Sequence, residues 1–466
     1  MSERIVNVIG AGLAGSEAAW QLARRGVRVR LHEMRPVRMT EAHQTALFGE
    51  LVCSNSLRND SLETAVGVLK EEMRRLGSIV IAAADGARVP AGSALAVDRE
   101  DFSRTITTTL ESHPLVEVTR AEATAIPDGP TIIASGPLTS PALSDEINRI
   151  VGSRHLYFYD AIAPIVAASS IDMSIAFKAS RWGKGGDDYI NCPLDERRYH
   201  EFVAAVMAAG KVAAHPFEKP VYFEGCMPIE EIARRGVMTL AFGPMRPVGL
   251  ADARGGARPY AVVQLRQDDR EAHLYNMVGF QTKMTYPEQR RVLRMIPGLA
   301  RAEFVRLGSL HRNTFIDSPR LLEPTLRLRG RAELFLAGQM VGVEGYVESA
   351  AAGMLAAINA ERLGRGAELV VPPRESAIGS LIAYITDAAR SDFQPMNANY
   401  GLMPELASRA RGRAKKIELG ARALGAFDGW IARHALAIPA AGAAAAGDAA
   451  RAAMPRAPDD QSLENL

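Results

Sequence analysis

The sequence predicts an α/β fold in which a parallel βαβ domain carries an inserted α+β domain. A β-branched apolar run near the N-terminus stops at a cluster of glycines and leads into a helical pattern. Two later apolar runs also end at glycine, as strands do where they reach a functional loop. Between these runs the pattern changes to mixed strands and helices with more aromatic residues and exposed charge. Such a change is typical of a second domain placed within the first.

The N-terminal segment predicts a strand, a helix and a second strand. The strand is expected at Ile5–Ile9, the helix from Ser16 to Arg25 and the next strand from Val27 to His32. A unit of this kind, about 30 residues long, opens dinucleotide-binding folds. Two further strands are expected from Thr131 to Ala134 and from Leu334 to Ala337.

The turn after the first strand matches the G-x-G-x-x-G pattern of dinucleotide sites. We expect Gly10 to permit the tight turn, Gly12 to leave space for a pyrophosphate, and Gly15 to let the helix pack closely on the strand. Glu33, at the end of the next strand, would accept hydrogen bonds from an adenosine ribose, which favours FAD or NAD over NADP. The predicted cofactor-binding residues of this segment are Gly10, Ala11, Gly12, Leu13, Ala14, Gly15 and Glu33.

A second small-residue segment, from Gly338 to Gly353, follows the later strand. It distinguishes an expected FAD site from an NAD site. Its helix N-terminus could approach a flavin ring and the ribityl phosphate, although close packing of the helix on the sheet explains the small residues equally well. We therefore predict FAD, with Gly338, Gln339 and Gly342 among its ligands, and an FAD-binding Rossmann-type fold that is glutathione-reductase-like.

Domain boundaries follow from these patterns. The FAD-binding domain is predicted at residues 1–156 and 308–437, and the inserted α+β domain, which would bind substrate and tRNA, at residues 157–307. The remaining residues, 438–466, form an Ala- and Pro-rich tail that we expect to be disordered, since it lacks large apolar side chains.

Composition limits the function classes. The 466 residues carry 55 Lys and Arg against 53 Asp and Glu, so an RNA site would have to be a local patch. Three scattered cysteines exclude a disulfide framework and a zinc site, and we expect no metal. No apolar run is long enough to span a bilayer, and no segment resembles a signal peptide. We expect a cytoplasmic protein without a membrane role or an obligate protein partner.

Four segments together resemble one family, the folate-dependent, FAD-using tRNA (uracil-5-)-methyltransferases. They are Val8–Glu17, Glu50–Ser56, Tyr222–Glu230 and Gly338–Gly353, and the similarity extends to about Trp430. A larger flavoprotein that modifies the wobble uridine of tRNA shares the first and last segments. It normally carries a further long C-terminal helical domain, for which this chain has no room.

The resemblance implies a reaction and its reagents. Flavin reduced by NADPH or NADH would receive the methylene group of methylenetetrahydrofolate and pass it to C5 of the T-loop uridine, in the T-arm of tRNA. Cys53 and Cys226 match the cysteines that the family uses, one to add to C6 of uracil and the other as base or flavin shield. Cys226 precedes a predicted helix start, which suits a nucleophile, yet the two roles could be reversed. Cys192 is expected to be a buried apolar side chain.

Other candidates and functions stay open. The polar segment 41–45, Lys283 and the loop 393–401 lie where ligand contacts are common, and a solvated surface explains them as well. Arginines at 290, 291, 294, 301, 306 and 312, and basic residues at 409, 411, 413, 415 and 416, could meet RNA phosphates or be solvated helix faces. The alternatives are the wobble-uridine-modifying flavoprotein, another FAD-dependent oxidoreductase, and a non-catalytic module with structural FAD.

Overall fold

The computed structural model describes residues 5–152, 156–212, 227–252, 254–255, 258–390 and 393–438. Cys226 and, apart from Ile438, the predicted disordered tail lie outside the described residues. Among the residues described, no helix combines the length and apolar character needed to cross a membrane.

A five-stranded sheet with the order β16-β7-β1-β2-β6 forms the centre of the molecule, and each neighbouring pair is parallel. Its strands are β1 (Ile5–Ile9), β2 (Arg28–His32), β6 (Val116–Thr119), β7 (Thr131–Ile133) and β16 (Leu334–Leu336). The strand order changes direction at β1, so the loops after β1 and β7 meet at the switch point where such sheets bind their ligands. The predicted α/β fold class is confirmed.

Helix α1 (Leu13–Arg24) begins three residues before the predicted start at Ser16. The predicted helix began only after the third glycine of the turn, whereas Gly15 lies inside α1, where a Cβ would lie 1.7 Å from the carbonyl oxygen of Gly10. The other predicted strands of this sheet differ from the observed ones by one residue at one end. Element ends are where local propensity yields most readily to tertiary contacts.

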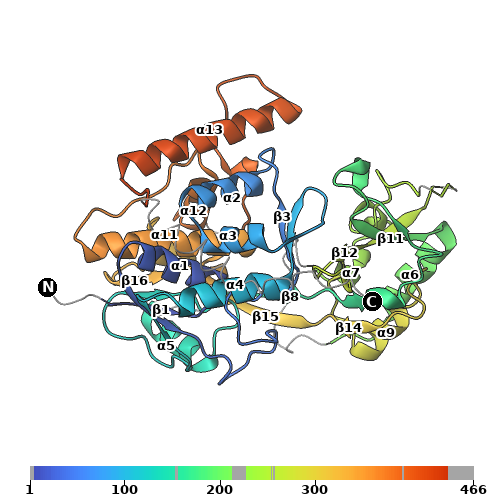
Figure 1. Ribbon diagram of the computed structural model, residues 1–466, viewed down its shortest axis with the longest axis horizontal. Helices are drawn as coiled ribbons and strands as arrows, with labels where there is room; N and C mark the ends of the chain where they lie inside the picture. The colour runs from blue at the N-terminus through green and yellow to red at the C-terminus, as the bar shows by residue number, and fades with distance from the viewer. Residues whose placement is uncertain are drawn as a thin grey trace, which may run out of the picture.

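Segments from both ends of the sequence build one hydrophobic core around this sheet. Helix α11 (Tyr346–Gly364) packs along α1, and a Cβ added at Gly353 would lie 2.0 Å from the carbonyl oxygen of Ala14. Figure 1 shows blue N-terminal elements beside orange and red C-terminal ones. The other helices of this core are α2 (Ala65–Arg75), α3 (Ile79–Gly86), α4 (Arg99–Glu111), α5 (Pro141–Val151), α10 (Ser318–Leu321), α12 (Ala377–Ile385) and α13 (Gly412–Arg433).

A second core surrounds a six-stranded sheet with the order β10-β11-β12-β13-β9-β14. The strands are β9 (Ile165–Ala167), β10 (Phe177–Lys178), β11 (Tyr189–Leu194), β12 (Ala261–Gln267), β13 (Leu274–Met277) and β14 (Phe304–Arg306). Its helices are α6 (Glu196–Ala208), α7 (Ile229–Arg234), α8 (Thr239–Phe242) and α9 (Tyr286–Leu293). These elements, green to yellow, occupy the right of Figure 1.

Two short sheets join these parts. Strands β8 (Leu156–Ala161) and β15 (Leu310–Phe315) pair antiparallel and run between the two cores in Figure 1. A three-stranded sheet of β3 (Ser56–Asn59), β5 (Ala94–Val97) and β4 (Arg88–Val89) lies at the edge of the first core. The exact domain boundaries at residues 156 and 307 stay a prediction.

Candidate active site

A cavity of about 520 Å³ lies at the switch point of the parallel sheet and extends to the six-stranded sheet. Its lining includes Ile9, Gly10, Gly12, Leu13, Ala14, Glu33, His43, Cys53, Arg58, Ser135, Arg266, Gly279, Gln281, Gly338, Gln339, Tyr346, Ser349 and Asn397. The cavity therefore collects residues from the first glycine turn, the second small-residue segment and both cores.

The glycine turn is shaped by three different constraints. Gly10 has φ +97°, and a Cβ there would lie 2.7 Å from the carbonyl oxygen of Ala134. A Cβ at Gly15 would lie 1.7 Å from the carbonyl oxygen of Gly10, whereas one at Gly12 would meet nothing within 4 Å. The space beside Gly12 belongs to the cavity, and the amide groups at the start of α1 border it. This arrangement fits the pyrophosphate of a dinucleotide.

Glu33 follows β2 and lines the same cavity. Its carboxylate accepts a hydrogen bond from the Ala11 amide at 3.1 Å and pairs with the Arg35 guanidinium at 2.9 Å. Burial opposes ionisation, but the hydrogen bonds and charge of Arg35 outweigh it and hold the pKa of Glu33 below its usual value. Arg35 was not predicted from the sequence as a site residue. The buried guanidinium of Arg35 keeps the Glu33 carboxylate ionised at the position expected to accept hydrogen bonds from a ribose.

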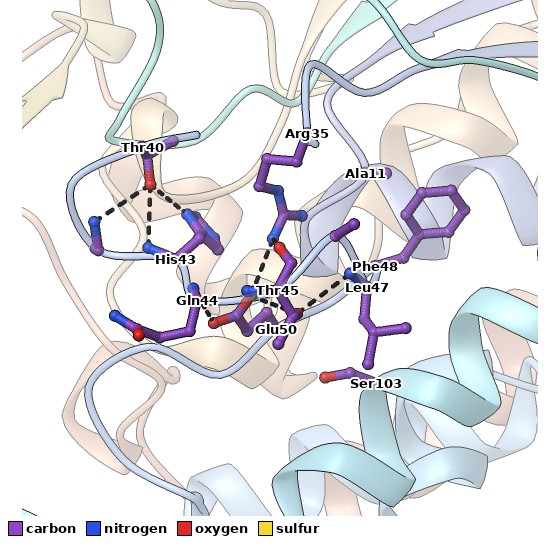
Figure 2. A network of polar contacts seen from close by, with 12 residues as sticks. Ala11, Arg35, Thr40, His43, Gln44, Thr45, Leu47, Phe48, Glu50 and Ser103 are labelled. Atoms are coloured by element: carbon purple, nitrogen blue, oxygen red, sulfur yellow. Dashed lines mark hydrogen bonds and ion pairs between the residues drawn. The ribbon is translucent and has the colours of Figure 1, made fainter. Parts of the chain in front are cut away.

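A polar network extends from Arg35 into the loop after β2, as Figure 2 shows. Arg35 Nη1 donates to Glu50 Oε2 at 3.1 Å, and Glu50 also accepts from the Gln44 and Thr45 amides. Thr40 Oγ1 lies 2.7 Å from Nδ1 of His43, which lines the cavity. Burial, followed by the charge of Arg35, lowers the pKa of His43 to about 4. His43 is therefore a neutral side chain at the cavity wall.

The second small-residue segment reaches the cavity at its beginning but not throughout. Gly338 and Gln339 line it, together with Tyr346 and Ser349 at the start of α11. Gly342 does not line the cavity. A Cβ added there would lie 2.3 Å from the ring of Phe393, which occupies the space beside it. Ala11 and Gly15 also lie outside the lining and contribute to the turn. All the other predicted cofactor residues come together at this cavity.

Cys53 lies at the cavity wall, in contact with Tyr346. The phenolic oxygen of Tyr346 accepts hydrogen bonds from the Cys53 amide at 2.8 Å and from the Ser54 amide at 3.1 Å. It lies 2.9 Å from Cys53 Sγ. Because two amides already occupy the oxygen, the phenol is oriented to donate its proton to the sulfur. Burial and the nearby thiol raise the pKa of Tyr346 well above its usual value, so the phenol keeps that proton.

Two buried arginines come close to Cys53 from different elements. Arg99, on α4, donates to the carbonyl oxygen of Leu51 at 2.5 Å and pairs with Asp268 at 2.9 Å. Arg266, on β12, donates to Ser54 Oγ at 2.6 Å. Burial lowers the pKa of Arg266, whereas at Arg99 burial is outweighed by nearby negative charge, that of Asp268 foremost, which raises the pKa; the charge of Cys53 favours the ionised form of both guanidiniums. Two cations near a sulfur favour its thiolate form, which is the nucleophilic or basic form of cysteine.

The remaining candidates are dispersed. Cys192 is fully buried on β11, where burial raises its pKa to about 12, which agrees with the expectation of an apolar role. Lys283 pairs with Glu231 and does not line the cavity. From the segment after Cys226, the Ile229 amide donates to the carbonyl oxygen of Gln281 at 2.8 Å, and Gln281 lines the cavity.

The two basic stretches have different surroundings. In the first stretch Arg291 pairs with Glu288, Arg294 donates to the carbonyl oxygen of Ala302, and Arg306 is half-buried. The second stretch lies at the start of α13, where Arg409, Arg411, Arg413 and Lys416 are exposed. Within the described residues, no group of three or more His, Cys, Asp or Glu side chains is arranged to hold a metal ion.

Comparisons with known proteins agree with this geometry. The family model of glucose inhibited division protein A matches residues 5–368. Methylenetetrahydrofolate–tRNA-(uracil-5-)-methyltransferase TrmFO of Geotalea uraniireducens is 60% identical over 433 residues, which are 92% of this chain and 99% of that protein. TrmFO of Listeria monocytogenes serotype 4b is 60% identical over 426 residues, covering 91% and 98%. The solved structure of Aquifex aeolicus GidA has a TM-score of 0.68 at 18% identity, covering 97% of this chain and 76% of that one.

The parallel sheet, its glycine turn and the cavity at the switch point define a protein with an FAD-binding Rossmann-type fold, related to glucose inhibited division protein A. Within that class, the chain belongs to the TrmFO family of methylenetetrahydrofolate–tRNA-(uracil-5-)-methyltransferases. The family resemblance carried by the four sequence segments is confirmed.

Proposed function

We propose that this chain is a methyltransferase that uses methylenetetrahydrofolate to methylate C5 of a uracil in tRNA, specifically the T-loop uridine in the T-arm. The observation that carries the proposal is the placement of Cys53, with its hydrogen-bonding Tyr346 and two neighbouring arginines, in the cavity that begins at the dinucleotide turn. The names of relatives 60% identical over most of the chain support the same activity.

FAD is the proposed cofactor, and the described residues fit it. Gly12 leaves open space, Glu33 supplies an ionised acceptor, and the starts of α1 and α11 border the cavity. Gly338 and Gln339 would hold the part of FAD nearer to α11. When bound, FAD would supply the two electrons that convert a methylene group to a methyl group. NADPH or NADH is the proposed source of those electrons.

The proposed roles of the cysteines follow the chemistry of uracil. C5 becomes nucleophilic only after a thiolate adds to C6, and we assign this addition to Cys226. Cys53 then acts as the base that removes the C5 proton, or shields the flavin. Tyr346 Oη–H would stabilise the Cys53 thiolate, and Arg99 and Arg266 would favour its charge.

We further propose that residues 157–307 are the inserted domain that contacts substrate. Arg266, Gly279 and Gln281 of this region line the cavity opposite the dinucleotide turn, which supports the proposal. A cytoplasmic location and the absence of an obligate protein partner stay predictions.

The test is transfer of labelled methylene from methylenetetrahydrofolate to unmodified tRNA by the flavin-loaded protein with NADPH. We expect label in 5-methyluridine of the T-loop with the wild type and with Cys192→Ala, which lies in the second core. Label should be lost with Cys226→Ala and with Cys53→Ala. If wild-type protein binds and reduces flavin but transfers no label, the proposal fails. A modified wobble uridine in the same tRNA would then favour the GidA-like activity.

A further inference from the structure

Trp182 stands on the surface in an unusual conformation. It is 70% exposed and lies in the loop between β10 and β11, within the segment 181–186. Its backbone has φ +60°, a left-handed conformation that residues other than glycine rarely adopt. A large exposed apolar side chain on a strained backbone is a feature that structural packing alone does not explain.

Neighbouring residues fix the indole in place. The Trp182 amide donates to the carbonyl oxygen of Gly249 at 2.8 Å, and a Cβ added at Gly249 would lie 2.7 Å from the indole. Gly249 therefore lets the ring rest on the backbone. The residue before it, Arg181, is also fixed, because its guanidinium donates to Gln264 Oε1 at 2.9 Å and to the carbonyl oxygen of Val248 at 2.8 Å. The ring is thus positioned in advance with most of its surface open to solvent.

Positive charge surrounds this ring. Lys184 and Arg246 are exposed, and burial together with the charge of Arg246 lowers the pKa of Arg181. Arg413, at the start of α13, pairs with Glu63, and its hydrogen bond lowers the pKa of that carboxyl, with smaller contributions from the charges of Lys184 and Lys416. The acidic side chains of the loop are Asp187, which is exposed, and Asp188, which accepts from the Gly92 amide at 2.6 Å.

The residues that support the ring are connected to the active-site cavity. The loop that supports it includes Pro244, and a Cβ added at Gly279 would lie 2.7 Å from Pro244. Gly279 lines the cavity. On β12, Gln264, which binds Arg181, is two residues from Arg266, another lining residue. The loops that hold the ring are therefore linked to two residues of the cavity lining, Gly279 and Arg266.

We propose that Trp182 is a stacking platform for an unpaired base of the RNA substrate, with Lys184 and Arg246 binding the adjoining phosphates. Proteins recognise unpaired bases by stacking them on exposed aromatic rings flanked by cationic side chains. The cations favour a polyanion over a second copy of this chain, because the chain has a net charge of +2 and so offers no overall negative charge to pair with them. The inference rests on the proposed tRNA substrate and specifies where that RNA is held outside the cavity.

Intrinsic fluorescence provides a direct test. The sequence has three tryptophans, and Trp20 and Trp430 are 7% and 4% exposed, so Trp182 dominates the solvent-accessible emission. Titration of the flavin-loaded protein with unmodified tRNA should quench this emission and protect it from acrylamide. In Trp182→Phe the accessible emission should be absent while tRNA affinity stays close to that of the wild type.

Steady-state kinetics separates this role from catalysis. Trp182→Ala should raise KM for tRNA by about tenfold, within the range expected for the loss of one stacked base, and leave kcat within about twofold. Trp182→Phe should restore KM, because phenylalanine still offers a π-face. Phe242→Ala is the matched control: Phe242 is an aromatic residue of the same core, 76% exposed, and its loss should not change KM. Lys184→Glu should weaken binding and reduce its salt dependence.

The outcomes distinguish this inference from the proposed activity. Suppose that the wild type methylates tRNA, that tRNA does not quench the emission of Trp182, and that Trp182→Ala leaves KM for tRNA unchanged. The stacking inference is then overturned and the methyltransferase proposal stands. If RNA quenches Trp182 but no label is transferred, the RNA surface stands and the methyltransferase proposal fails. If the emission of Trp182 is quenched as the protein concentration rises in the absence of RNA, the ring lies in a contact between two copies of the chain. That result would overturn the inference.

Discussion

Gly12 and Gly15 lie three residues apart, yet an added methyl group would meet opposite surroundings at the two positions. At Gly15 it would overlap the Gly10 carbonyl, whereas at Gly12 it would enter the cavity. We expect Gly15→Ala to destabilise the apoprotein by at least about 1–3 kcal/mol, as overpacking does. Thermal unfolding of the flavin-free protein measures this effect.

Gly12→Ala is the matched variant of the same turn. Gly12 has φ −71°, which alanine adopts readily, so the apoprotein should unfold within a few degrees of the wild type. FAD affinity should fall by about tenfold or more, equivalent to about 1.4 kcal/mol, because the methyl group occupies the space left for the cofactor. Unchanged FAD affinity in Gly12→Ala would contradict the assignment of this turn to the cofactor.

Tyr346→Phe tests the oxygen beside Cys53. The change removes a hydrogen bond to the sulfur and leaves the Cys53 and Ser54 amides without this partner, at a cost of about 1–3 kcal/mol for each unsatisfied group. We expect alkylation of Cys53 by iodoacetamide at neutral pH to slow by about tenfold, in line with the loss of a hydrogen bond to a charged group. Peptide mass spectrometry measures modification at Cys53 separately from the other cysteines.

Tyr384→Phe is the control, since its hydroxyl donates to the carbonyl oxygen of Gln394 and lies outside the cavity lining. It should alkylate at the wild-type rate. An equal rate in Tyr346→Phe would show that the phenol does not stabilise the thiolate.

At the scale of elements, the loop between β2 and β3 holds a buried neutral histidine. The pKa of His43 is about 4 in the fold and about 6.5 in an unfolded chain. Between these values the unfolded state binds more protons, so the stabilisation is complete above pH 6.5 and is lost as the pH falls toward 4. The slope from this group is at most about 1.4 kcal/mol per pH unit.

We expect His43→Gln to flatten the acid side of the stability profile, because glutamine keeps a polar contact to Thr40 without titrating. Urea unfolding of the apoprotein at several values between pH 4 and 7 gives the comparison. Parallel profiles for the two proteins would mean that the pKa of His43 is the same in the folded and unfolded states.

The sequence predicted elements where a local pattern has one physical cause. β1 was predicted to the residue because a β-branched run ends at glycine. A helix start after Cys226 was also predicted, and α7 begins there at Ile229, after Pro228. The start of α1 was missed since close packing overrides the propensity of Gly15. Tyr346 and Arg266 were missed as site residues because only the folded chain brings α11 and β12 to Cys53. The one available signal was that Tyr346 follows Gly345 within a segment already selected.

At the scale of the molecule, one buried ion pair joins the two cores. Arg99 belongs to α4 and Asp268 follows β12, and the Asp268 side chain is 4% exposed. Asp268→Ala would leave the guanidinium without its carboxylate, at a cost of about 3–5 kcal/mol. Because Arg99 also binds the carbonyl oxygen of Leu51, the change should displace the segment that carries Cys53 and reduce methyl transfer.

A double-mutant cycle measures the coupling. Arg99→Met with Asp268→Leu should lose less stability than the sum of the two single changes, with a coupling of about 0.5–3 kcal/mol. Calorimetry should resolve two unfolding transitions in Asp268→Ala if the pair links the cores. Strict additivity would indicate that the cores are coupled through other contacts.

The pairing of α1 with α11 also governs when the protein can first hold a cofactor during its own synthesis. Gly353, which packs against Ala14, leaves the ribosome about 340 residues after Gly12. At about 5–20 residues per second this interval is roughly 20–70 seconds. Throughout it, the nascent chain displays the unfinished edge of β7 and the small-residue face of α1 without their partners. Flavin capture must therefore wait until α11 has been synthesised and can pack on α1.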